Sequence, residues 1–149
     1  MRAISTIRKP LITIDCDRTV TEAARLMDEH AVGALIVTDD NDRLAGIVTD
    51  RDIVVRGVAR RIAPDARIDS VMTTQPVTIP ADADVRDALP LFRTHAVRRA
   101  VIVDGDRPLG LVSVDDLLID LVSDLSDLVR PVTGQVLFGH PEPSVPATA

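Results

Sequence analysis

The sequence predicts a mixed α/β (α+β) protein made of two tandem β-α-β-β-α repeats packed about a pseudo-twofold axis. The first reason is self-similarity. With a shift of 65 positions residues 13–39 match residues 78–104, and after a one-residue gap residues 42–52 match 106–116. The second is that apolar spacing alternates between the helical and the strand period within each half. The third is a content of 46% hydrophobic residues, nearly all aliphatic, which suffices for a packed core.

The first half contains these segments in order. An extended segment at 11–14 precedes a helix whose start carries the capping box Thr19-Val20-Thr21-Glu22. One face of this helix holds apolar residues at the i, i+3, i+4, i+7 spacing: Val20, Ala23, Ala24 and Met27. Strands are predicted at 34–37 and 44–48, and a second helix begins at Asp50.

The second half repeats this order, with an extended segment at 76–79, strands at 100–103 and 109–112, and a second helix from Val114. The apolar face of its first helix consists of Val85, Ala88, Leu89 and Phe92. Pro90 lies inside that helix and is expected to bend it or to shorten its regular part.

These segments divide the chain into a first repeat at 1–62, a second repeat at 63–130 and a proline-rich tail at 131–149. One repeat alone cannot bury both faces of its small sheet, so the pair is expected to be the folding unit. The four prolines of the tail predict no regular helix, with mobility from Glu142 onward. Because Phe138 is one of only two aromatic residues, it is predicted to dock on the folded body or on a partner.

Charge and composition disfavour several classes of function. A net charge of −6, a pI near 4.9 and 1% aromatic residues oppose nucleic-acid binding. The single cysteine, Cys16, allows no intramolecular disulfide and indicates a reducing, cytoplasmic location. No apolar run has the length of a membrane span.

Two similar motifs carry the chemistry. Thr49 and Asp52 stand where the first half's last strand meets its second helix, and Ser113 and Asp116 stand at the matching place of the second half. A hydroxyl at the N-cap suits a phosphate or ribose oxygen, and a carboxylate one turn later accepts hydrogen bonds from a ribose diol. The same spacing is also a variant of a capping box, which only stabilises a helix.

Gly46-Ile47-Val48-Thr49-Asp50-Arg51-Asp52 and Gly110-Leu111-Val112-Ser113-Val114-Asp115-Asp116 resemble the signature of cystathionine-β-synthase (CBS) domains, and 71–78 looks like the usual start of a repeat. The resemblance, which covers 11–122, implies a pair of repeats that binds an adenosine nucleotide (AMP, ADP, ATP or a related ligand) in clefts between them. Ten residues are the expected ligand contacts: Thr49, Asp52, Ser113 and Asp116 for ribose, Arg51, Arg98 and Arg99 for phosphates, and Ala34, Ile36 and Ala100 beside the adenine.

A stand-alone regulatory module, not an enzyme, is the function that these features favour. The chain shows no nucleophile–base pair and no Gly-rich phosphate loop, and no cofactor is required. His30 and His95 end their helices, where interaction with the last carbonyls is expected in place of metal binding. Output then passes through a protein partner or a change of shape.

Two alternatives remain open at this point. The first is a ligand-independent dimerisation or interaction module that has kept the fold. The second, based on Arg51, Arg56, Arg60 and Arg61, is an association with DNA. A homodimer is expected in any case, because the apolar residues of the last helix wrap more than one face: Leu117, Leu118, Leu121, Val122, Leu125, Leu128 and Val129.

Overall fold

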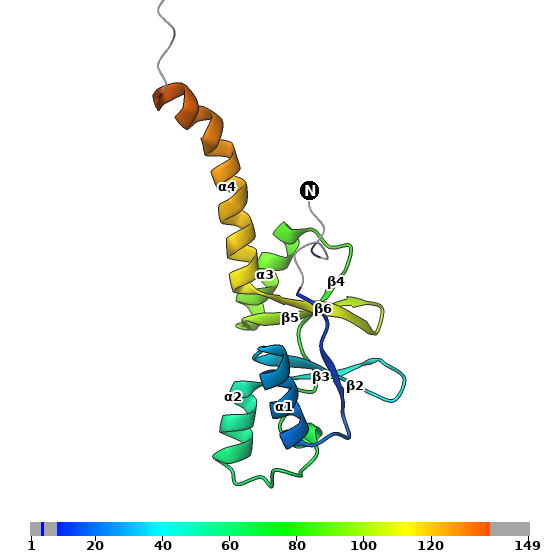
Figure 1. The fold of residues 1–149 in the computed structure, drawn as a ribbon. Helices are drawn as coiled ribbons and strands as arrows, with labels where there is room; N and C mark the ends of the chain where they lie inside the picture. The colour runs from blue at the N-terminus through cyan, green and yellow to red at the C-terminus, as the bar shows by residue number, and fades with distance from the viewer. Residues whose placement is uncertain (1–3, 5–8, 138–149) are drawn as a thin grey trace, which may run out of the picture. The chain divides into compact units, whose positions relative to one another are not determined.

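The structure is a computed structural model that describes Ile4 and residues 9–137, with side chains up to Arg130. It contains two three-stranded sheets and their helices, so the predicted mixed fold of two β-α-β-β-α repeats is confirmed (Figure 1). The chain divides into two compact units, residues 1–117 and 118–149. Both sheets belong to the first unit.

The first repeat forms a sheet in the order β1-β2-β3. Its elements are β1 (Thr13–Asp15), α1 (Val20–His30), β2 (Ala34–Thr38), β3 (Leu44–Thr49), α2 (Asp50–Asp52) and the π-helical η2 (Ile53–Val58). Strand β1 runs parallel to β2, and β2 runs antiparallel to β3. A polar connector, residues 59–67, then leads to the 3₁₀ turn η3 (Ile68–Ser70).

The second repeat has the same topology, with the strand order β4-β5-β6. Its elements are β4 (Thr78–Pro80), α3 (Val85–His95), β5 (Arg99–Asp104), β6 (Arg107–Ser113) and α4 (Val114–Leu137). The register of the antiparallel pair shifts after Ile102, and the corresponding pair of the first repeat shifts after Val37. Because Val37 and Ile102 are repeat-equivalent under the 65-residue shift, the two halves share this irregularity as well as their order.

Helices α1 and α3 differ from the prediction in one position each. The predicted capping box of α1 is confirmed, but Ala24 and Leu89, assigned to the apolar faces, are exposed. The buried stripe of each helix is therefore narrower than predicted. Leu26 of α1 and Leu91 of α3 are partly buried and pack against the two cores instead. Pro90 does not shorten α3, which has 11 residues like α1, because a proline on an exposed face removes a single helical hydrogen bond.

The two cores exchange segments between the repeats. The core of the first repeat includes Ile68 and Val71, which follow the connector and are fully buried. The core of the second repeat includes Ile4, which precedes β1 of the first repeat in the chain and is also fully buried. Each core therefore includes at least one residue that precedes the first strand of the other repeat, which binds the two repeats into one folding unit.

Helix α4 overturns one prediction about the tail. It continues to Leu137, so the expectation of no regular helix after Arg130 is wrong for 131–137. Apolar residues continue at helical spacing through Val132 and Val136, and Pro131 removes only one backbone donor from the helix. The expected docking of Phe138 lies outside the described residues. Among the described helices, none combines the length and apolarity needed to cross a membrane.

Candidate functional site

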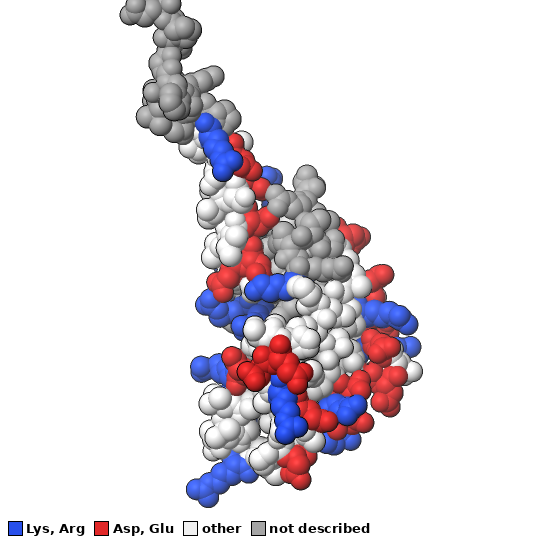
Figure 2. Space-filling view, in the orientation of Figure 1, with Lys and Arg blue, Asp and Glu red and all other residues white. Residues whose placement is uncertain are grey.

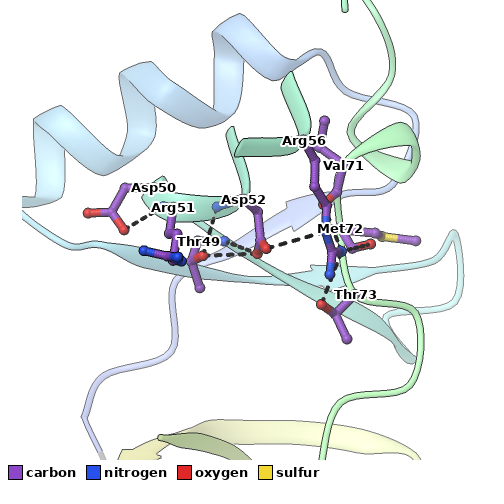
Figure 3. Close-up of polar contacts among 8 residues, drawn as sticks. All are labelled: Thr49, Asp50, Arg51, Asp52, Arg56, Val71, Met72 and Thr73. Carbon is purple, nitrogen blue, oxygen red and sulfur yellow. Dashed lines mark hydrogen bonds and ion pairs between the residues drawn. The ribbon is translucent and has the colours of Figure 1, made fainter. Parts of the chain in front are cut away.

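The first motif forms a complete capping box at the start of α2 (Figure 3). The Thr49 hydroxyl accepts a hydrogen bond from the Asp52 backbone N–H at 3.1 Å. In return, Asp52 Oδ2 accepts from the Thr49 backbone N–H and from the Thr49 hydroxyl, both at 2.9 Å. The capping-box interpretation is thus confirmed here, and the contact of these side chains with a ligand stays a prediction.

The second motif repeats this geometry at the start of α4. Asp116 Oδ2 accepts from the Ser113 hydroxyl at 2.7 Å and from the Ser113 backbone N–H at 2.9 Å. The other carboxylate oxygen, Oδ1, lies 3.3 Å from the ammonium of Lys9, the only lysine in the sequence. Lys9 also pairs its backbone with Leu111 in the second repeat, which fixes the stem of the side chain beside Asp116.

Asp52 has a different cation as its neighbour. Arg56 Nε lies 3.8 Å from Asp52 Oδ1, and Arg56 Nη1 donates to the carbonyl oxygens of Val71 at 3.3 Å and Met72 at 3.1 Å (Figure 3). The same nitrogen lies 3.4 Å from the hydroxyl of Thr73. Arg56 therefore joins the first motif to the linker between the repeats, residues 71–73.

The surroundings of Asp116 lower the pKa of its carboxyl group. Burial acts most strongly and raises the pKa, but hydrogen bonds from Ser113 and the charge and hydrogen bond of Lys9 together outweigh it. Because the folded-state pKa is lowered, the stabilisation from ionised Asp116 is complete above the unfolded pKa of about 3.9. It disappears as the pH falls through the folded value.

Replacing Lys9 with Met is expected to raise the pKa of Asp116, since the nearest positive charge is removed. The loss of stability at pH 7 should be no more than about 1 kcal/mol, because Lys9 is 66% exposed, and it should vanish where Asp116 is protonated. Carboxyl NMR titration and urea unfolding at pH 7 and at acid pH measure both effects. Arg43→Met, which breaks the exposed pair with Asp106, is the control and should leave the Asp116 titration unchanged.

A cleft of about 340 Å³ lies between residues of the two repeats. Ala34 and Ile36 of β2 line it from the first repeat, and Arg99 and Leu111 line it from the second, together with Lys9. Ala34 and Ile36 point away from the first core because Leu35 and Val37, on the other face of β2, fill that core. The cleft thus combines an apolar wall with two cationic side chains.

The structure brings only some of the predicted contacts to this cleft. Ala34, Ile36 and Arg99 line it, whereas Ala100 lies on the other face of β5 and packs into the second core. Thr49 is the register partner of Ala34, and Ser113 is the register partner of Arg99, so both motifs begin next to cleft residues. The four motif side chains themselves are not among the residues that line the cleft.

The remaining arginines have individual surroundings. Arg98 forms an exposed ion pair with Asp115 at 3.2 Å, which offsets its charge. The guanidinium of Arg51 is exposed at the start of α2. Arg56, named for DNA association, contacts the linker carbonyls and Asp52, and its side chain is 40% exposed. Lys9 was not among the predicted site residues, because it precedes the segment at 11–122 that carries the family resemblance.

A second hollow, of about 440 Å³, lies over α1 and β1 and contains none of the predicted contacts. Three of its charged side chains pair with one another, since Arg18 lies 3.3 Å from Glu22 and 3.9 Å from Asp15. This pairing is typical of a solvated helix surface. In the part of the chain that the structure describes, no three His, Cys, Asp or Glu side chains gather as metal ligands.

The two capping motifs and the cleft between paired β-α-β-β-α repeats define a tandem-repeat module of the CBS type. The CBS-domain family profile matches the chain twice, at residues 2–58 and 68–123, and the chain belongs to this family. The CBS domain-containing protein YhcV of Bacillus subtilis is 34% identical over 121 residues, covering 81% of this chain and 86% of that protein. Hypoxic response protein 1 of Mycobacterium tuberculosis is 35% identical over 100 residues, covering 66% and 70%.

Solved structures show the same fold. The crystal structure of Hypoxic Response Protein I with two coordinated zinc ions has a TM-score of 0.70 at 31% identity, covering 78% of this chain and 97% of that one. The CBS domain pair of protein MJ0100, in complex with 5′-methylthioadenosine and S-adenosyl-L-methionine, has a TM-score of 0.75 at 24% identity, covering 83% and 98%. At that identity, the likeness to MJ0100 shows the fold alone.

Proposed function

We propose that this chain is a stand-alone regulatory CBS pair that binds an adenosine-containing ligand between its repeats. The observation that carries the proposal is the cleft, in which Ala34 and Ile36 face Lys9 and Arg99. An apolar wall next to cations fits a flat base attached to an anionic group. The MJ0100 pair, which shares the fold, is in complex with two adenosyl ligands of this chemical class.

The two motif carboxylates would accept hydrogen bonds from the ribose of such a ligand. One oxygen of each carboxylate is held in its capping box, so the second oxygen is the one that a ribose hydroxyl would reach. That oxygen faces Lys9 at Asp116 and Arg56 at Asp52. A ligand would therefore share or displace these cations, and at Asp52 the displacement would loosen the bonds from Arg56 to the linker carbonyls.

The output of this module would pass through a homodimer or a protein partner in the cytoplasm, without catalysis. Exposed apolar residues support a homodimer, because three of them recur at equivalent places. Val54, Val55 and Val58 of η2 are 58%, 44% and 71% exposed. Their equivalents Leu118, Ile119 and Val122 are 50%, 70% and 59% exposed. Such repeated apolar patches mark protein–protein contact.

Calorimetric titration with AMP, ADP, ATP, NAD, S-adenosylmethionine and methylthioadenosine tests ligand binding. Replacing Asp52 or Asp116 with Ala should weaken binding roughly 10- to 100-fold, the effect of losing hydrogen bonds to a charged group. Asp65→Ala, which removes an exposed carboxylate from the connector, is the matched control and should bind like the wild type. Equal affinity in all the variants would refute the site.

The titration also decides the main alternative. A chain that binds none of these compounds, and yet is dimeric, would be a ligand-independent interaction module. Lower thermal stability of the Asp variants with unchanged affinity would mean that Asp52 and Asp116 serve their capping boxes alone. Thermal melts of each variant are therefore recorded with and without ligand.

A further inference from the structure

Helix α4 extends well past the repeat to which it belongs. Its counterpart in the first repeat, α2 followed by η2, ends at Val58, whose equivalent is Val122, whereas α4 continues to Leu137. Along α4, Leu121, Leu125 and Leu128 are 47%, 54% and 72% exposed. In proteins most of the stability of a helix comes from packing of its apolar face, so burial of these side chains would stabilise α4.

The spacing of the leucines is that of a coiled-coil seam. Leu118, Leu121, Leu125 and Leu128 follow one another in steps of three, four and three, which places them at the a and d positions of a heptad. Val122 and Val129 occupy the neighbouring e positions and widen the apolar stripe. No described residue in an a or d position of this stretch is polar.

The charges of α4 lie away from this seam. Asp120 and Asp127 both occupy the c position, on the opposite side of the helix, and only Asp124 flanks the seam. Figure 2 shows uncharged surface along one side of α4, next to a group of acidic side chains. Two identical copies of the seam can therefore meet without bringing most of their carboxylates together.

The same charges disfavour a membrane surface as the occupant of the seam. Helices that lie in a lipid interface carry Lys and Arg on the polar face, whereas the polar side chains of α4 up to Arg130 include five aspartates and one arginine. Anionic lipids would repel such a face. A protein helix with an equivalent leucine seam fits, and the chain itself supplies one.

We infer that α4 pairs with α4 of a second copy through the seam formed by Leu118, Leu121, Leu125 and Leu128. The inference rests on the homodimer of the proposed function and assigns to it a contact surface on α4, outside both buried cores. It does not depend on the ligand cleft.

Light scattering of the full chain at micromolar concentration tests the inference. The wild type should have the mass of two 16.1 kDa chains. Leu125→Asp, which places a carboxylate in the seam, should have the mass of one chain. Ser123→Asp is the matched control, since it adds the same charge at the f position, outside the seam, and it should remain dimeric.

Three results would overturn the inference: a monomeric wild type, a dimeric Leu125→Asp variant, or the same dissociation in both variants. If Leu125→Asp is dimeric while Val54→Asp is not, the homodimer stands and uses the repeat surface instead of the seam. The thermal melt of the repeat unit should be unchanged in Leu125→Asp, because this residue belongs to neither buried core. Nucleotide titration of the same variant reports separately on the ligand site.

Discussion

Replacing Ile68 with Ala is expected to destabilise the protein by about 2–5 kcal/mol, the range for truncating a fully buried aliphatic side chain. Ile68 belongs to the segment between the repeats, yet it packs in the core of the first repeat among Ile14, Val20 and Leu35. Its backbone N–H also donates to the carbonyl of Arg18 at 2.8 Å, which leaves the side chain little freedom to collapse into the cavity. A loss of this size is a large part of the stability of a small domain.

The reciprocal variant Ile4→Ala should have a comparable effect, because Ile4 is fully buried in the second core and its N–H donates to the Ala83 carbonyl at 2.9 Å. Ile62→Ala is the control, since this connector isoleucine is half-buried and should cost about 1 kcal/mol or less. Urea unfolding with two probes measures all three variants. A single transition is expected for each, and separate transitions for the two repeats would contradict the exchange of segments.

Most of the fold follows from periodicity that can be read locally. Strands β2 and β3 begin at the predicted residues, and each ends one residue later than expected. Both second helices start where the motif spacing places them, at Asp50 and Val114. The ends of an apolar strand are marked by turn residues within a few positions of it, so they can be predicted from local sequence. Because the chain is a repeat, each element is also predicted independently in both halves.

The exchange of segments has no local signal. Ile4 and Ile68 lie outside the segments that were predicted as helices or strands, and their burial results from contacts far away in the sequence. The cation beside Asp116 has no local signal either, because Lys9 and Asp116 are separated by most of the chain. Arg56 lies one helical turn from Asp52, and this i, i+4 spacing is enough to predict their ion pair. The hydrogen bonds from Arg56 to the linker, in contrast, depend on the tertiary fold.

The direction of the side chains on a strand was predicted less well than the position of the strand in the sequence. Ala34 and Ala100 were both placed at the cleft, but they occupy opposite faces of equivalent strands. The repeat-equivalent of Ala34 is Arg99, one position before Ala100. A shift of one residue along a strand reverses the direction of the side chain, so an error of this size changes a ligand contact into a core residue.

Replacing Gly46 with Ala is expected to destabilise the protein by about 1–3 kcal/mol, because the first CBS motif begins where another segment passes in contact with its backbone. A Cβ atom at Gly46 would lie 2.5 Å from the carbonyl oxygen of Thr73 and 3.0 Å from the sulfur of Met72. That carbonyl accepts a hydrogen bond from the Ile47 N–H at 3.0 Å, and the Thr73 N–H donates back to Ile47 at 2.9 Å. The linker can make room for a methyl group only by breaking this pair.

Gly57→Ala is the matched control for this substitution. A Cβ atom there would meet Val71 at 3.8 Å and Ile53 at 4.0 Å, which are ordinary contacts, and the residue is helical. Alanine should therefore leave stability unchanged or raise it by up to about 1 kcal/mol. Thermal melts of both variants make the comparison, with each kcal/mol shifting Tm by about 2–4 °C.

Because Arg56 holds the carbonyls of Val71 and Met72, amide exchange at 71–73 should accelerate in Gly46→Ala and remain slow in Gly57→Ala. Equal melting temperatures and equal exchange would mean that the linker does not press against Gly46.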